Sequence, residues 1–464
     1  MTTYAEVLAE LELRWEPRTV PDLTRITAVL DLLGSPHRAY PAVHVTGTNG
    51  KTSTARMVES LLRSFGLRTG RYTSPHLEDV RERISVDGEP LSPEAFAAAY
   101  DDVAATVALV DRDALAAGGE TVSYFELLTA MAFASFADAP VDVAVVEVGL
   151  EGRWDATNVL DAQVCVVTPV SLDHTALLGD DVASIAAETA GIISAGAVTV
   201  LAPQPPDAAQ VLLRHCVEVG ATVAREGVEF GILSREVAVG GQRLVLQGLG
   251  GIYDDLFLPL HGVHQAHNAA CALAAVEAFL GAGQGAEGQG AEGQGAEGQR
   301  GRLDAEAVRE GFAAATSPGR LEVVRSGPTV LLDGAHNPAG AEALVAAIGE
   351  AFAFERLVGV VGVLADKDAA VMLATLEPIL AQVVCTSSTS PRALPADELA
   401  RAAVDVFGAD RVEAVPGIAA ALEVAVQLVE DDDELIGSTG GGVLVTGSLI
   451  TVGEARALLG PHPR

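Results

Sequence analysis

A glycine-rich loop carries one of the two lysines in this 464-residue chain. The loop GTNGKTS, residues 47–53, follows the apolar run Ala42–Val45 and leads into an amphipathic segment. Such a strand–loop–helix unit offers backbone N–H groups and a helix amino terminus to an anion, and its lysine reaches the outer phosphates of a nucleotide. The general phosphate-loop pattern has a glycine where this chain has Val45, so the loop fits a shorter variant. We therefore expect a nucleotide-phosphate site at Lys51.

The composition narrows the classes of partner. The formal net charge is −34, which argues against nucleic acid or an anionic membrane surface as the partner, because both are polyanions. Hydrophobic residues make up 49% of the chain, as in a globular protein, and no apolar run is long enough to span a bilayer. The amino-terminal residues lack the basic region of a signal peptide. We expect a cytoplasmic monomer.

Strand-like and helix-like patterns alternate along the chain. The expected strands are Ala42–Val45, Val141–Val148, Val164–Val170, Val198–Leu201, Val330–Asp333, Val358–Leu364, Val383–Thr386 and Val443–Gly447. The expected helices include Phe125–Ala137, Val182–Ile193, Asn268–Leu280, Asp304–Ala315, Pro338–Phe352 and Asp397–Phe407. Near-continuous apolar strands between helices indicate a mostly parallel sheet with both faces covered. Ligands gather at the carboxyl ends of such strands.

Two features divide the chain. Residues 281–301 contain GAEGQ three times and no apolar residue larger than alanine, which predicts a flexible surface insertion. One further helical pattern follows this insertion and ends before Ser317-Pro318-Gly319. We therefore expect an α/β fold with two domains: residues 1–317, with the phosphate loop in a mostly parallel sheet, and residues 318–464, a smaller Rossmann-like α/β domain.

Further sequence blocks accompany the phosphate loop in a fixed order. They are TSPHL (73–77), RERI (81–84), SYFE (123–126), EVGLEGRWDATN (147–158), LDHT (172–175), HQAHNA (264–269), PGRL (318–321), DGAHNP (333–338), VLADKD (363–368) and GSL (447–449). Together, over nearly the whole chain, they resemble the folylpolyglutamate synthase/dihydrofolate synthase family, which is related to the Mur amide ligases.

The resemblance implies an ATP-driven amide ligase. In such an enzyme a substrate carboxylate takes the γ-phosphoryl group, and the α-amino group of L-glutamate then displaces phosphate from the acyl phosphate. Because two polyanions must meet, the site needs Mg²⁺, lysine and arginine to neutralise charge and align the reactants. The expected partners are ATP, L-glutamate and dihydropteroate or folate-type molecules. We expect a bifunctional enzyme.

The same resemblance assigns the site residues. The ATP-binding residues are Thr48, Asn49, Gly50, Lys51, Thr52, Ser53, Asn268, Arg320 and Asp333. The Mg²⁺ ligands are Ser74, Glu147 and His174. The residues that bind the pterin and pteroate portion are Phe125, Gly152, Arg153, Trp154 and Asp155. The catalytic residues are Lys51, His174, Arg320 and His336.

Each of these residues has a plainer interpretation. Taken alone, Glu147 would be a cap or a surface charge, His174 a solvated loop residue, and Phe125 part of a helix core. The block His336-Asn337-Pro338 would be a helix N-cap followed by proline at the first helical position. The functional interpretation prevails because the residues recur at strand ends and all blocks occur together.

Two positions depart from the family pattern. The family carries a lysine whose carbamate bridges metal ions, and the matching residue here is Thr189; Glu151 stands where glycine is usual. Losing an anionic ligand predicts weaker binding of a second Mg²⁺. Two alternatives therefore stay open: a ligase of the same superfamily acting on a non-folate acid, and a catalytically impaired nucleotide-binding protein.

Overall fold

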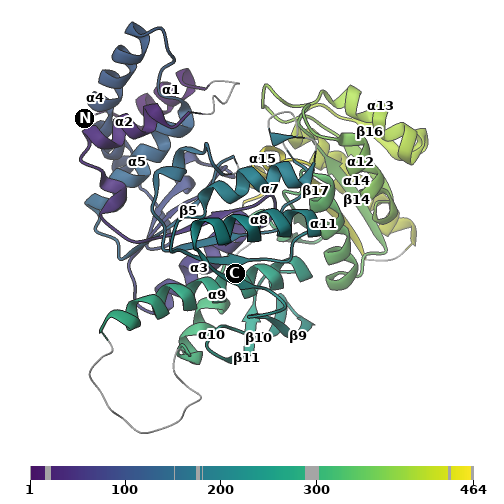
Figure 1. Ribbon diagram of the computed structural model, residues 1–464. Coiled ribbons are helices and arrows are strands. Elements are labelled where there is room, and N and C mark those ends of the chain that lie inside the picture. The colour runs from purple at the N-terminus through teal and green to yellow at the C-terminus, as the bar shows by residue number, and fades with distance from the viewer. Residues whose placement is uncertain are drawn as a thin grey trace.

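The computed structural model of the chain describes residues 2–15, 22–150, 152–173, 178–179, 181–287, 302–436 and 440–460. These residues form an eight-stranded, a three-stranded and a six-stranded sheet, with helices packed against them (Figure 1). Over the described ranges, no helix combines the length and the apolar character needed to cross a membrane.

The large sheet has the strand order β4-β3-β2-β5-β1-β6-β7-β8. From β2 to β8 along this order every pair is parallel, and β3 and β4 form an antiparallel edge. The bounds are β1 Ala42–Thr46, β2 Thr69–Tyr72, β3 Ile84–Val86, β4 Glu89–Pro90, β5 Val143–Glu147, β6 Val164–Val167, β7 Val198–Leu201 and β8 Thr222–Arg225.

Both faces of this sheet are buried, because successive side chains alternate between two cores. In β5, Ala144 and Val146 belong to one apolar cluster, whereas Val143 and Val145 belong to the other. The first cluster is covered by α1 Tyr4–Leu13, α2 Thr24–Leu32, α4 Pro93–Ala116, α5 Tyr124–Asp138, α7 Val182–Thr189 and α8 Pro206–Val219. The second is covered by α3 Lys51–Ser64, α9 Val263–Glu287, α10 Ala305–Ala313 and the three-stranded sheet.

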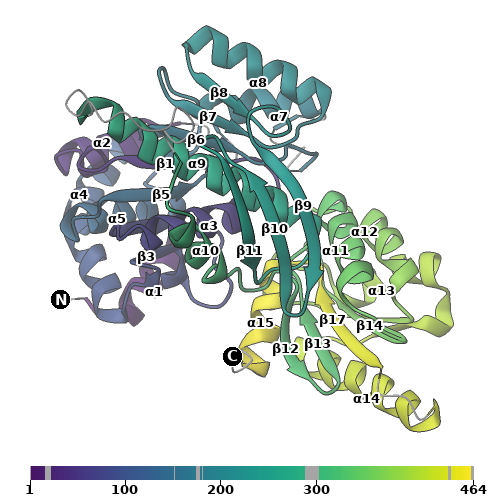
Figure 2. The ribbon, with the colours of Figure 1, turned by 90° about the horizontal axis from the view of Figure 1, so that it is seen from below.

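The three-stranded antiparallel sheet was not expected from the sequence. It consists of β9 Gly231–Ala238, β10 Gly241–Gln247 and β11 Ile252–Leu258. Figure 2 shows these strands extending from the large sheet toward the carboxy-terminal part of the chain. At that end Arg235 of β9 forms a 2.6 Å ion pair with Glu350 of α11 (Pro338–Ala351).

The six-stranded sheet has the order β12-β13-β17-β14-β15-β16 and is parallel except for β12. Its strands are β12 Glu322–Ser326, β13 Thr329–Leu332, β14 Arg356–Val361, β15 Gln382–Cys385, β16 Val412–Ala414 and β17 Gly441–Thr446. One face packs on α11, α12 Ala369–Leu376 and α13 Ala396–Phe407, and the other on α14 Ile418–Ile436 and α15 Leu449–Leu459.

The expected α/β fold is confirmed, and every strand expected from the sequence is present with small shifts at its ends. Helix α9 continues to Glu287 and so enters the stretch from residue 281 that was expected to be a flexible insertion; the flexibility of that stretch stays a prediction. Residues 288–301 lie outside the described part. The expected domain boundary near residue 318 falls between α10 and β12, and the division itself stays a prediction.

Candidate functional site

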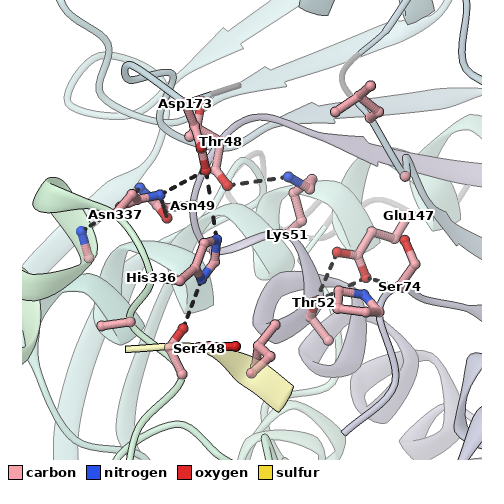
Figure 3. A pocket seen from close by; sticks show the side chains of 18 of the residues that line it. Thr48, Asn49, Lys51, Thr52, Ser74, Glu147, Asp173, His336, Asn337 and Ser448 are labelled. Carbon is pink, nitrogen blue, oxygen red and sulfur yellow. Dashed lines mark hydrogen bonds and ion pairs between the residues drawn. The ribbon is translucent and has the colours of Figure 1, made fainter. Parts of the chain in front are cut away.

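A cavity of about 1370 Å³ lies at the carboxyl ends of β1, β5 and β6, facing the six-stranded sheet. Lys51 and Glu147 line it from the side of the large sheet, and His336 and Lys367 line it from the other side. Figure 3 shows the labelled side chains converging from both parts of the chain. This is the place at which a doubly wound sheet collects its ligands.

The phosphate loop joins β1 to α3 and is held by the segment after β6. Thr48 donates its N–H to the Pro169 carbonyl oxygen at 3.0 Å and its hydroxyl to the Ser171 carbonyl oxygen at 3.1 Å. The Lys51 ammonium folds onto the loop and donates to the carbonyl oxygens of Gly47 (2.5 Å) and Thr48 (3.2 Å). The ammonium therefore lies at the loop that leads into α3, and the first turn of this helix offers unpaired N–H groups to an anion.

The backbone conformation and the close surroundings of residue 50 explain why a glycine precedes Lys51 in this loop. Its φ is +93°, which side chains rarely adopt, and an added Cβ would lie 2.5 Å from Oδ1 of Asn268. Asn268 is buried at the start of α9 and donates to Gln265 at 3.1 Å, and Gln265 reaches the hydroxyl of Ser53. The structure thus brings Asn268 against the phosphate loop, from which it is far removed in sequence.

Glu147 ends β5 inside the cavity wall with 1% of its surface exposed. Its carboxylate accepts the Thr52 hydroxyl at 2.8 and 3.0 Å and the Ser74 N–H at 3.2 Å. Burial raises the pKa of Glu147, and the nearby Lys51 charge opposes that rise. A buried carboxylate beside two hydroxyl-bearing residues is a set of hard oxygen donors that fits Mg²⁺. Of the three expected ligands, His174 lies outside the described residues.

Asp333 and Arg320 flank the start of the six-stranded part. The Asp333 carboxylate accepts the N–H groups of Leu321 and Ala335, both at 2.8 Å, so it fixes the backbone on either side of the cavity wall. Burial raises its pKa, and the Arg320 charge opposes the rise. Both residues line the cavity, so the expected ATP contacts are open to them.

The sequence analysis missed a polar cluster that joins the two parts of the chain. Asp173 forms an ion pair with Lys367, and its other oxygen accepts the Asn337 amide at 3.2 Å. Asn337 also exchanges hydrogen bonds with Asn49 of the phosphate loop, at 3.0 and 3.3 Å. The available signals were the isolated second lysine and an aspartate six residues after the end of β6. Their pairing spans 194 residues, which no local pattern reveals.

The helix-cap interpretation of residues 336–338 is also confirmed. Asn337 is the N-cap of α11 and accepts the Gly340 N–H at 2.8 Å, with Pro338 at the first helical position. The cap positions His336 beside it, whose Nδ1 lies 2.8 Å from the Gly334 carbonyl oxygen. Capping and cavity lining are therefore properties of the same turn.

Aromatic side chains line the opposite end of the cavity. Phe125 packs 5.8 Å from the Tyr72 ring and against the backbone of Gly149, and Trp154 is 47% exposed. Asp155 lines the cavity but uses its carboxylate to accept N–H groups of Gly149, Leu150 and Thr157, at 2.8 to 2.9 Å. It thereby shapes the loop that carries Trp154.

Gly152 and Arg153 are not among the residues that line the cavity. Gly152 has a φ of +108°, and a Cβ there would strike the Glu188 carbonyl oxygen, which also accepts the Arg153 N–H at 3.0 Å. Their contact with substrate stays a prediction. Thr189 is fully buried and donates to the Ile185 carbonyl oxygen, whereas its neighbour Glu188 lines the cavity. Glu151 lies outside the described residues.

Buried neutral histidines predict a loss of stability in mild acid. Burial lowers the pKa of His44 to about 3 and the pKa of His264 and His336 to about 4. The unfolded chain takes up a proton on each ring below its ordinary value of about 6.5. The free energy of unfolding should therefore fall as the pH drops from about 6.5 toward 4, by about 1–2 kcal/mol per ring at pH 5.

Urea unfolding at pH 7.5, 6 and 5 measures this effect. His44→Gln isolates one ring, because its glutamine can still bond the Thr157 hydroxyl, which lies 2.8 Å from Nε2 of His44. The difference in unfolding free energy between wild type and variant should change across this pH range. A constant difference would contradict the prediction.

Comparison with known proteins assigns the family. Residues 319–449 match the model of the Mur ligase glutamate ligase domain. The chain is 53% identical, over 98% of its length and 93% of the other protein, to the dihydrofolate synthase/folylpolyglutamate synthase of Mycobacterium tuberculosis. The corresponding Bacillus subtilis protein is 34% identical, over 86% of this chain and 88% of its own length.

The fold agrees with these matches. A solved structure of Mycobacterium tuberculosis folylpolyglutamate synthase, complexed with ADP, superposes with a TM-score of 0.92 at 52% identity and covers 99% of both chains. Identity at this level over both full lengths exceeds what a shared fold alone produces. The chain therefore belongs to the dihydrofolate synthase/folylpolyglutamate synthase family of ATP-dependent ligases.

Proposed function

We propose that this protein adds L-glutamate to dihydropteroate and to reduced folates, with ATP as the energy source. The observation that carries the proposal is that one cavity brings together the phosphate loop, an aromatic end and a polar end with a second lysine. ATP, a flat heterocyclic acid and a small amino acid each need one of these environments. The family relationship supports the same assignment.

The reaction is a phosphoryl transfer followed by an acyl transfer. An oxygen of the folate-type carboxylate attacks the γ-phosphorus, and the bond to the bridging oxygen of ADP breaks. The glutamate amine then attacks the acyl carbon, and phosphate leaves. Both steps concentrate negative charge, which Lys51 and Arg320, two cationic residues that line the cavity, can neutralise.

Thr52, Ser74 and Glu147 are the described residues that would hold Mg²⁺. When bound, the ion supplies positive charge to the transferring phosphoryl group. Glu147 keeps the Thr52 hydroxyl and the Ser74 backbone in place through the three hydrogen bonds given above. The three donors are therefore organised before a nucleotide arrives.

The glutamate site lies at the polar end, beside His336 and Lys367. The Gly334 carbonyl oxygen can only accept, so Nδ1 of the neutral His336 ring donates to it, and Nε2, which carries the lone pair, lies 3.7 Å from a carboxylate oxygen of Asp173. The depressed pKa, about 4, keeps this ring neutral at physiological pH. The neutral ring can accept a hydrogen bond from the glutamate ammonium, and Lys367 can pair with a glutamate carboxylate when it leaves Asp173.

The pteroate portion occupies the aromatic end, where Phe125 and Trp154 present ring faces to a planar heterocycle. Because the phosphate loop, the aromatic end and the polar end all come from the same chain, we propose that the enzyme works as a monomer. Size-exclusion chromatography with light scattering tests that part. A stable dimer would contradict it.

An ADP-release assay tests the reaction. ADP should form with ATP, Mg²⁺, dihydropteroate and L-glutamate together, and release should drop to background when either acceptor is omitted. Tetrahydrofolate in place of dihydropteroate tests the second activity. Release only with a non-folate carboxylic acid would favour the other ligase class, and nucleotide binding without any release would favour an impaired enzyme.

A further inference from the structure

The first turns of α9 carry a histidine whose ring is oriented by a hydrogen bond to a buried carboxylate. His267 lines the cavity with 37% of its side chain exposed, and its Nδ1 lies 2.5 Å from Oε1 of Glu226. Glu226 follows β8 and has only 4% of its side chain exposed. Its second oxygen accepts the thiol of Cys271, one helical turn beyond His267. The carboxylate is therefore fully engaged with α9.

This pairing determines which proton the neutral ring carries. A carboxylate only accepts hydrogen bonds, so Nδ1 of neutral His267 must be the N–H donor. The other nitrogen, Nε2, then carries a lone pair and can only accept. No described residue supplies a donor to Nε2 within hydrogen-bond distance, and it belongs to the half of the ring that Glu226 does not cover. The ring thus presents an acceptor to the cavity.

The surroundings of His267 suit a nucleotide base. Its neighbour in sequence, Asn268, lies against Gly50 of the phosphate loop, so this part of the cavity begins where the phosphates bind. The cavity is also lined by Ala343, Leu344 and Ala347 of α11, which are small or apolar. A planar purine buries its faces well against such side chains, while its polar edge reaches the helix turn.

We propose that the Glu226–His267 pair selects adenine over 6-oxopurines. Nε2 of His267 accepts a hydrogen bond from the 6-amino group, whereas the 6-oxo group of hypoxanthine or guanine presents a second acceptor to it. When two hydrogen-bond acceptors face each other in the complex, both lose their bonds to water and gain no partner. This loss of binding free energy is larger than the net gain from one hydrogen bond. The inference rests on the proposed function, because it assumes that ATP binds with its phosphates at Lys51.

Equilibrium binding of ADP and IDP tests the pair without requiring ligation. Wild type should bind ADP at least about tenfold more tightly than IDP, from one unpaired polar group. His267→Leu should bring the two dissociation constants close together. Glu226→Ala frees the ring to adopt either tautomer and should also reduce the ratio. Glu226→Gln should restore it, because the glutamine oxygen accepts the same N–H.

Cys271→Ala is the matched control, since it removes the other contact of Glu226 and should leave the ratio unchanged. A ratio that stays the same in His267→Leu, or a loss in Glu226→Gln equal to that in Glu226→Ala, would overturn the inference. The proposed reaction can be contradicted independently of this inference. If the wild type bound ADP selectively but had no ligase activity, only the proposed reaction would be contradicted. A wild type that binds neither nucleotide would overturn both.

Discussion

Lys51→Ala is expected to lower the ligation rate by about a thousandfold or more while the protein stays folded. The ammonium sits over the first turn of α3, within 3.2 Å of two loop carbonyl oxygens, and the chain's other lysine is paired with Asp173. No other lysine can take over the charge. Steady-state ADP release with saturating dihydropteroate and L-glutamate measures the rate, and thermal melting confirms the fold.

Arg112→Ala is a suitable control for the loss of one positive charge. Arg112 lies on α4, is 72% exposed and pairs only with its neighbour Asp113 among the described residues. Such an exposed pair contributes little to stability or to the field in the cavity. The control should keep full activity. If folded Lys51→Ala also kept comparable turnover, the assignment of residues 47–53 as the phosphate loop would be wrong.

The sequence predicted those strands whose side chains are almost all apolar. The parallel strands are runs of apolar residues buried on both faces, so β1, β5, β6 and β7 were recognisable without a partner. The strands β9 to β11 are different. Half of β9 faces solvent, and Leu233 and Val237 are exposed, so its pattern shows neither a buried run nor a clean alternation.

Only those parts of the site that lie within a single sequence motif were predictable from the sequence. The phosphate loop and the Glu147 block each lie on one strand end, and both reach the cavity. Asp173, Asn337 and Lys367 meet only because the six-stranded part folds against the large sheet, which depends on the whole tertiary structure. Asp155 shows the converse: its block pointed to a substrate contact, and its hydrogen bonds reveal that it also organises its own loop.

Glu147→Gln is expected to lower the ligation rate by about a hundredfold and to raise the Mg²⁺ concentration needed for half-maximal rate. The amide keeps the size of the side chain but removes the negative charge that an Mg²⁺ ligand supplies. The fold should tolerate the change, because burial already disfavours this charge, as its raised pKa indicates. A Mg²⁺ titration of ADP release measures both quantities, and thermal melting should show a shift of only a few degrees.

Glu277→Gln makes the same replacement at a buried carboxylate that does not line the cavity. Glu277 accepts the Tyr253 hydroxyl at 2.8 Å and the N–H groups of Leu249 and Gly250. An amide nitrogen would face one of these donors, so this variant should melt earlier yet keep the wild-type Mg²⁺ requirement. The two variants should therefore show opposite patterns of stability and activity. If Glu147→Gln behaved like Glu277→Gln, Glu147 would be a structural carboxylate, and the proposed Mg²⁺ site would have to lie elsewhere.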